Sequence, residues 1–256
     1  MTEPHPPADV LSTVLYATGG VFELAVTRRL AQRTSAYQEI LVVDTVDHGR
    51  CLVIDGVMQT ASTDHLLYDD ALLSRLQRQD RAVLIVGGGD GYVARRVHEV
   101  APEARLVVVD IDSDVVELAE RWLNPGFSTD AHTELHIGDG VAFARAQPAG
   151  SFDGVVLDLT DIPLDPARSA DVARLFREMI DAVLPLVRAG GWLAMQGGPS
   201  KVPAGELDVA SLAGALLEGA LHDLVRLDVY LPSYGEGNAF FHGIVRAGAP
   251  VEEAEP

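Results

Sequence analysis

The sequence predicts an α/β protein in which a Rossmann-like sheet follows a small antiparallel β domain. One observation is the stretch 83–112, where an apolar strand, a glycine-rich turn, a helix, a second strand and an acidic end follow one another. Another is the alternation of strands and helices that continues after residue 112. A third is the run of hairpin signals before residue 80. We therefore expect two domains, 10–79 and 80–248, the larger one built around a nucleotide-binding turn.

The composition describes a globular chain with an acidic surface. Of the 256 residues, 48% are hydrophobic, and the formal net charge is −19. This charge argues against binding to nucleic acids or anionic membranes and is compatible with a cationic small-molecule partner, although solubility alone also accounts for it. The apolar runs are too short to span a membrane, and we expect a cytoplasmic protein. Because Cys51 is the only cysteine, no internal disulfide is possible.

Hairpin signals organise the expected N-terminal domain. Short turns that contain Asp and Gly, at 47–49 and 55–56, separate segments of strand-like composition. The first two strands are expected around the glycine pair at 19–20. The predicted strands are 14–21, 24–30, 38–45, 50–54 and 57–60. Asp64 then helps to cap a helix that is predicted to run toward Leu76.

The larger domain is predicted to alternate strands with helices. Its parallel strands are expected at 83–86, 106–109, 134–137, 154–157 and 192–196. Its helices are expected at 92–100, 115–123, 141–147, 170–187 and 204–221. Strands 224–230 and 239–246 would close the sheet as an antiparallel hairpin, and the proline-containing segment 162–169 would loop over the strand ends. This is the sheet plan of S-adenosylmethionine-dependent transferases.

Four aspartates predict a ligand site at one edge of this sheet. They lie just beyond the carboxyl ends of successive strands, at Asp90, Asp110, Asp139 and Asp158. One such aspartate is commonly a helix cap or a turn residue, but four in succession are hard to assign to capping alone. The glycines at 87–91 let backbone N–H groups approach a ligand, and Asp110 can accept both hydroxyls of a ribose. Together they describe a pocket for a molecule with a ribose, an exocyclic amine and a positive charge.

Several motifs resemble those of one known family, the polyamine aminopropyltransferases of the spermidine synthase type. The resemblance covers nearly the whole chain, and the motifs are specific in combination. They are S-A-Y-Q-E-I at 35–40, L-V-I-D-G-V-M-Q at 52–59, G-G-G-D-G at 87–91, D-I-D at 110–112, G-D-G at 138–140, D-L-T-D at 158–161 and Q-G at 196–197.

The resemblance implies transfer of the aminopropyl group of decarboxylated S-adenosylmethionine to an amine such as putrescine, with release of methylthioadenosine. The donor would be a co-substrate and no cofactor would be permanently bound; a homodimer is expected. At matched positions, Gln38 and Asp90 would hold the aminopropyl end, Asp110 the ribose, and Asp139 the adenine amino group. The other donor-binding residues would be Gly87, Gly89 and Gly140.

On the acceptor side, the resemblance implies that Asp158 and Asp161 are the catalytic carboxylates that face the amine. The substrate-binding residues would be Gln59, Tyr68, Asp161, Gln196 and Tyr234. Attack on the carbon beside a sulfonium requires a neutral amine, whereas a free alkylamine has a pKa of roughly 10. A nearby carboxylate can bind the ammonium form and then accept its proton. Since the sulfonium charge disappears in the transition state, we expect the rate to come from in-line positioning and proton removal rather than from uniform binding.

The chain departs from the family pattern in three motifs. Where the family has G-G-D-G-G-x-x-R-E, Tyr92 replaces the last glycine and Arg96 the glutamate. We expect Tyr92 to project near the nucleotide or to block part of its usual space. The family's D-E-x-x-Y-H-E stands as D-H-L-L-Y-D-D at 64–70, and its P-T-Y-P-x-G-x-W-G-F stands as P-S-Y-G-E-G-N-A-F-F at 232–241. The donor-side acids are thus kept while the acceptor side drifts.

Three rival functions stay open on the sequence alone. An enzyme of the same fold could use intact S-adenosylmethionine for methyl or aminocarboxypropyl transfer; Asp90 would repel the α-carboxylate of that donor but could equally bind its α-amine. A catalytically inactive nucleoside- or polyamine-binding protein is opposed by the presence of both Asp158 and Asp161. A purely structural module is opposed by the run of strand-end acids. The histidines are scattered without ligand spacing, so no metal site is expected.

Overall fold

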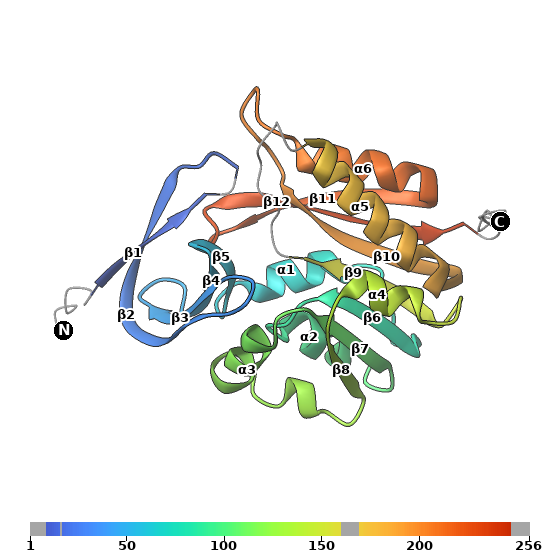
Figure 1. Ribbon diagram of the computed structural model, residues 1–256, viewed down its shortest axis with the longest axis horizontal. Coiled ribbons are helices and arrows are strands. Elements are labelled where there is room, and N and C mark those ends of the chain that lie inside the picture. The colour runs from blue at the N-terminus through green and yellow to red at the C-terminus, as the bar shows by residue number, and fades with distance from the viewer. Residues whose placement is uncertain (1–8, 16, 160–168, 247–256) are drawn as a thin grey trace.

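Two sheets lie side by side in the molecule (Figure 1). The computed structural model describes residues 9–15, 17–159 and 169–246. A five-stranded N-terminal sheet precedes a seven-stranded sheet that carries helices on both faces. The predicted fold class is confirmed, because the larger sheet is Rossmann-like and ends in an antiparallel hairpin.

The N-terminal sheet is antiparallel, and its strands pair in chain order. They are β1 (Asp9–Val14), β2 (Val21–Thr34), β3 (Glu39–Thr45), β4 (Arg50–Ile54) and β5 (Val57–Ala61). The predictions for β3 to β5 are confirmed. The predicted strand 14–21 is wrong: β1 ends at Val14 and β2 begins at Val21, and between them Leu15 N donates to Gly20 O at 2.8 Å and Gly19 has a φ of 64°, as in a turn.

Helix α1 (His65–Leu72) joins the two sheets. It begins where predicted but ends four residues before Leu76. The carboxylate of Asp64 makes no side-chain cap bond; it instead accepts from Ser233 N at 2.8 Å, which ties the start of the helix to the C-terminal hairpin. The expected domain boundary at residue 79 lies between α1 and β6, and as a boundary between independent units it stays a prediction.

The larger sheet has the strand order β11-β12-β10-β9-β6-β7-β8. The strands from β10 to β8 are mutually parallel, whereas β12 pairs antiparallel with both β10 and β11. Their bounds are β6 (Ala82–Gly87), β7 (Arg105–Asp110), β8 (Thr133–Ile137), β9 (Phe152–Asp158), β10 (Val187–Pro199), β11 (Leu221–Leu231) and β12 (Glu236–Val245). Every strand predicted for this sheet is present.

Helices cover both faces of the larger sheet. The apolar side chains of β6 alternate between the faces, so that Val83 and Ile85 pack with α1, α2 (Tyr92–Val100) and α3 (Ser113–Trp122). Leu84 and Val86 pack on the opposite face with α4 (Gly140–Arg145), α5 (Ser169–Val183) and α6 (Val209–Ala220). Fully buried parallel strands need such coverage on both sides.

Two helix predictions are wrong at their ends. The helix predicted for 170–187 stops at Val183, because Pro185 lies in the short 3₁₀ helix η3 (Leu184–Leu186) and cannot continue an α-helix. The helix predicted from residue 204 begins only at Val209, where Asp208 caps it by accepting from Ser211 N at 2.8 Å. Of the expected loop 162–169, residues 162–168 lie outside the described residues.

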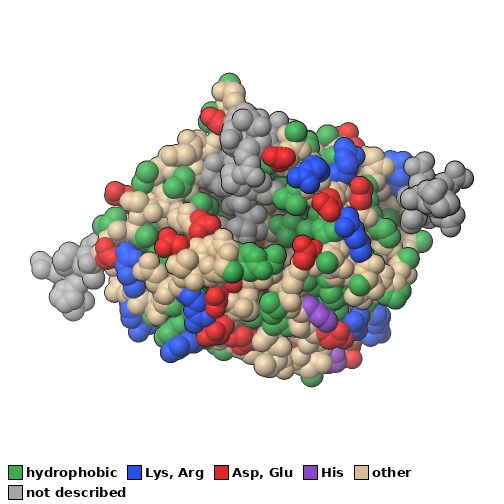
Figure 2. All heavy atoms as spheres, viewed as in Figure 1, with side chains coloured by type: hydrophobic (Ala, Val, Ile, Leu, Met, Phe, Trp, Pro, Cys, Tyr) green, Lys and Arg blue, Asp and Glu red, His purple; other side chains and the backbone are tan. Residues whose placement is uncertain are grey.

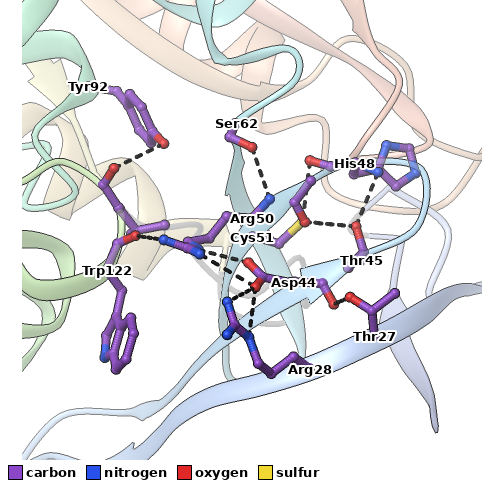
Figure 3. A network of polar contacts seen from close by, with 12 residues as sticks. Thr27, Arg28, Asp44, Thr45, His48, Arg50, Cys51, Ser62, Tyr92 and Trp122 are labelled. Carbon is purple, nitrogen blue, oxygen red and sulfur yellow. Dashed lines mark hydrogen bonds and ion pairs between the residues drawn. The ribbon is translucent and has the colours of Figure 1, made fainter. Parts of the chain in front are cut away.

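Polar contacts fasten the N-terminal sheet to the larger one (Figure 3). Arg50 on β4 donates to Asp44 Oδ1 at 2.8 Å and to the carbonyl oxygen of Trp122, at the end of α3, at 2.6 Å. Arg33 on β2 reaches Asp114 at the start of the same helix, at 2.6 Å. These contacts hold the N-terminal sheet over the carboxyl edge of the larger sheet.

The surface carries both signs of charge. On the face shown in Figure 2, acidic and basic side chains are interspersed, and the described residues there form no continuous basic patch. No helix within the described ranges is long and apolar enough to cross a membrane.

Candidate active site

A cavity of about 330 Å³ opens at the carboxyl ends of the parallel strands, between the two sheets. It brings together all the predicted site residues that lie in the described part of the chain: Gln38, Gln59, Tyr68, Gly87, Gly89, Asp90, Asp110, Asp139, Gly140, Asp158, Gln196 and Tyr234. Asp161 lies outside the described residues. The individual roles expected for these residues stay predictions.

The glycine turn after β6 packs directly against two of the acids. Gly87 has a φ of 87°, and a Cβ on it would lie 1.8 Å from the backbone oxygen of Asp158. A Cβ on Gly89 would lie 2.4 Å from Asp110 Oδ2, to which Gly89 N donates at 3.0 Å. Only residues without a side chain allow this approach, so the turn lies directly against the backbone of Asp158 and the carboxylate of Asp110.

Asp110 is held in place by backbone groups. Its Oδ1 accepts from Asp112 N at 2.8 Å, and its Oδ2 accepts from Gly89 N. Burial raises the pKa of Asp110, while these two hydrogen bonds oppose the rise. A carboxylate fixed in this way can present its remaining lone pairs to a ligand hydroxyl.

Gln38 lies at the Asp110 end of the cavity. Its Nε2 donates to Asp112 Oδ2 at 2.9 Å, and the same oxygen accepts from Ser35 Oγ at 2.6 Å. Asp112 also caps α3 by accepting from Asp114 N. This network orients the Gln38 amide, whose oxygen is left to accept from a ligand. The expectation that Gln38 holds an aminopropyl end is untested.

Asp139 lines the cavity and caps α4 as well. Its Oδ1 accepts from Ala142 N at 2.7 Å, as an N-cap residue does, and its side chain is exposed. Asp139 therefore serves as a helix cap through Oδ1, and its Oδ2 can still contact a ligand.

The pKa of Asp158 is shifted far from the usual range of a carboxyl group. Burial raises its pKa to about 7, and the hydroxyl of Tyr68, which donates to Asp158 Oδ1, opposes the rise. The pKa of Asp90 is also raised well above its usual range, first by burial and then by the charge of Asp158. Asp90 Oδ1 accepts from Tyr92 N at 3.0 Å. Clustered carboxyl groups of this kind can bind cations and exchange protons near neutral pH.

Aromatic and amide side chains form the wall near Asp158. The Tyr68 ring meets Phe240 edge-on at 4.9 Å between centroids, and Tyr234 donates its hydroxyl to the carbonyl oxygen of Gln59. Gln196 Nε2 donates to Asn238 Oδ1 at 3.2 Å. Gln59 Nε2 is buried and has no hydrogen-bond partner among the described residues, so it is a donor that a ligand could satisfy.

Sequence reasoning missed several residues of the cavity. Thr60, Asp69 and Met179 also line it. Asp69 follows Tyr68 in the motif at 64–70, and its only signal in the sequence is a departure from the family pattern. Met179 lies on α5, and nothing in the sequence indicates which turn of that helix faces the strand ends.

The expectation for Tyr92 is wrong. This residue is buried outside the cavity lining, with its ring stacked on His65 at 4.0 Å between centroids and its hydroxyl 3.5 Å from the carbonyl oxygen of Leu123 (Figure 3). The first turn of α2 directs this side chain toward α1 and the end of α3. Within the described residues, no group of three or more His, Cys, Asp or Glu side chains could hold a metal ion.

Family models match both parts of the chain. Residues 71–245 match the "Spermine/spermidine synthase domain", and residues 13–62 match the "Spermidine synthase tetramerisation domain". Among curated relatives, "Polyamine aminopropyltransferase" from Pyrobaculum arsenaticum is 32% identical over 246 residues, which cover 91% of this chain and 82% of the relative. "Spermidine synthase 2" from Datura stramonium is 34% identical over 174 residues, which cover 65% of this chain and 54% of the relative. The chain thus spans about half the length of the plant relatives that it matches.

Solved structures share the fold. "Spermidine Synthase from Thermotoga Maritima" superposes with a TM-score of 0.80 at 20% identity, over 95% of this chain and 82% of the other. A spermidine synthase in complex with the transition state analogue AdoDATO gives 0.81 at 19% identity, over 95% and 83% of the two chains.

Proposed function

The chain belongs to the spermine/spermidine synthase family, and from this premise we propose that it transfers the aminopropyl group of decarboxylated S-adenosylmethionine to an amine such as putrescine. The observation that carries the proposal is one cavity lined by Asp90, Asp110 and Asp158, in which the hydroxyl of Tyr68 donates to Asp158 Oδ1.

The donor is proposed to lie along the ends of β6 and β7. Asp110 would accept the ribose hydroxyls, because its backbone bonds already fix its orientation. Asp90 would face the ammonium of the aminopropyl group, and Asp139 with Gly140 would lie at the adenine. Gln38 would accept from the donor through its amide oxygen. The apolar side chains of the cavity wall favour the flat face of a nucleobase.

The acceptor amine is proposed to lie beside Asp158. This carboxylate would accept a proton from the ammonium form, and the nitrogen lone pair would then form the new C–N bond. The C–S bond breaks as its electron pair passes to sulfur, which leaves as the neutral thioether methylthioadenosine. The positive charge thereby passes from sulfur to the nitrogen of the product. Asp161 would hold the far side of the amine, with Gln59, Gln196 and Tyr234 along its channel.

We also propose that the protein assembles at least as a dimer through its N-terminal part, residues 10–79. The match of 13–62 to a tetramerisation domain supports this, and so do the exposed apolar side chains of Val10, Val14 and Val21 on β1 and β2. Apolar side chains gathered on one sheet surface are typical of association sites.

Calorimetric titration of the protein with decarboxylated and intact S-adenosylmethionine, followed by a panel of amines, tests the proposed function. We expect the decarboxylated donor to bind more tightly and turnover to require an amine. Tighter binding of the intact donor, with transfer of its methyl or aminocarboxypropyl group, would contradict the proposal in favour of the same-fold alternative.

A further inference from the structure

Asp69 is a further buried carboxyl group in the cavity, beside Asp90, Asp110 and Asp158, and the proposed reaction does not use it. It follows Tyr68 on α1, its side chain is 2% exposed, and it lines the same cavity as Asp90 and Asp158. A buried carboxylate is costly unless another group compensates its charge. Asp69 has a hydrogen-bond partner on the same helix.

His65 hydrogen-bonds to Asp69 from the side away from the cavity, and this bond opposes the rise that burial causes in the pKa of Asp69. Its Nδ1 lies 2.8 Å from Asp69 Oδ2, one helical turn along α1. The His65 ring stacks on Tyr92 with an interplanar angle of 26°, and neither ring lines the cavity. The stack fixes the orientation of the His65 imidazole, and the imidazole fixes the orientation of the Asp69 carboxylate through the hydrogen bond.

The charge of Asp69 reaches both neighbouring carboxyl groups. It raises the pKa of Asp90 and that of Asp158, as a like charge close to each of them does. Any anionic group of a ligand that entered this region would meet the same repulsion, whereas an ammonium would be attracted.

We propose that Asp69, held by His65, is a specificity-determining residue that excludes donors carrying an α-carboxylate. Intact and decarboxylated S-adenosylmethionine differ only by that group, and Asp90 alone could bind the α-amine that both possess. A second carboxylate beside Asp90 adds repulsion against the α-carboxylate and attraction for the ammonium. The inference rests on the proposed function and names the feature that selects its donor.

The test compares the affinities of decarboxylated and intact S-adenosylmethionine in wild type and in Asp69→Asn, measured by calorimetry. Asparagine keeps the shape but removes the charge, so we expect the preference for the decarboxylated donor to fall at least about tenfold. Methylthioadenosine, which carries neither group, serves as the reference ligand and should bind both proteins equally. Asp70→Asn is the matched control, because Asp70 lies outside the cavity lining and pairs with Arg96 at 2.8 Å.

The exchange variant His65→Asp/Asp69→His separates specificity from stability. It keeps one imidazole and one carboxylate at the same spacing but moves the carboxylate away from the cavity. If this double variant loses the donor preference at an unchanged melting temperature, the proposal is supported. This test remains available if Asp69→Asn fails to fold. An unchanged preference in either folded variant would overturn it. Failure of wild type to bind methylthioadenosine would contradict the proposed function instead.

Discussion

At the scale of single residues, the site depends on opposing effects at Asp158. Burial moves its pKa to about 7, while the hydrogen bond from Tyr68 favours the ionised form. A general base is most effective when its pKa lies near the working pH. The pair therefore suits proton removal from an ammonium that would otherwise stay charged at neutral pH.

The rate of transfer should depend on pH through Asp158. Below pH 7 the carboxyl group is protonated and cannot accept a proton, so turnover at saturating substrate should fall as the pH decreases through about 7. Tyr68→Phe removes the hydrogen bond that stabilises the Asp158 carboxylate, so the pKa of Asp158 should rise. The acidic limb of the pH profile, where turnover falls, should then lie about one pH unit higher. Profiles of kcat against pH for both proteins check this. A limb that stays in place or moves to lower pH in Tyr68→Phe would contradict the assignment.

At the scale of elements, the sequence predicts strands and helices correctly where a strong residue pattern determines the structure of a segment. The β6–turn–α2–β7 unit has a buried strand, glycines with positive φ and an amphipathic helix, and all its parts lie where expected. The strand ends also predict which acids meet, because parallel strands present their carboxyl ends at one edge. Those acids line one cavity, together with residues from α1 and the N-terminal sheet.

The failures have local causes that pattern alone does not reveal. The segment 14–21 has strand-like composition, yet β1 ends at Val14, and Leu15 N donates to Gly20 O before β2 begins at Val21. The direction of Tyr92 depends on the packing of α2 against α1 and α3, which is a tertiary property. Asp139 both caps α4 and lines the cavity, and this double position likewise depends on the tertiary structure.

Substitutions in the glycine turn should separate binding from folding. In Gly89→Ala the new Cβ would lie 2.4 Å from Oδ2 and 2.8 Å from Cγ of Asp110, and its three nearest atoms all belong to that side chain rather than to backbone. The Asp110 side chain should therefore shift, so the chain should fold while nucleoside affinity falls by about 1–3 kcal/mol. In Gly87→Ala the Cβ would meet the backbone oxygen of Asp158 at a positive φ, so the fold itself should suffer. Calorimetry with methylthioadenosine and thermal denaturation measure the two effects. Wild-type affinity in Gly89→Ala would show that the turn does not control Asp110.

At the scale of the whole molecule, the cavity exists because the two sheets are docked. The N-terminal sheet contributes Leu52, Ile54, Gln59 and Thr60 to its wall, and Gln38 comes from the connection between β2 and β3. Ile40, Val42, Leu52 and Ile54 belong to the same apolar cluster as α1 to α3. Ligand binding and docking of the sheets should therefore be coupled.

Arg50→Ala should loosen this docking. Arg50 bridges Asp44 and the Trp122 carbonyl, and its loss leaves both acceptors without that donor, at a cost of about 1–3 kcal/mol in the free energy of unfolding. Arg28→Ala is the matched control, because Arg28 binds the same Asp44 within the N-terminal sheet and is 62% exposed (Figure 3). Urea denaturation with and without methylthioadenosine measures both. Equal losses in the two variants would refute a docking role for Arg50.

The proposed assembly makes its own prediction. Light scattering at micromolar concentration should give at least the dimer mass, and Val10→Asp with Val21→Asp on the exposed N-terminal strands should lower it. A monomer mass for wild type would refute the assembly.

Release of methylthioadenosine by wild type and by Asp158→Asn, in the presence of putrescine and longer amines, tests the central claim most directly. We predict amine-dependent release by wild type and a rate about 10²–10⁴-fold lower for the variant, because asparagine keeps the shape of the site but cannot accept a proton. Binding of methylthioadenosine should be equal in the two proteins. Equal rates of release, or no release by wild type with any amine, would contradict the account.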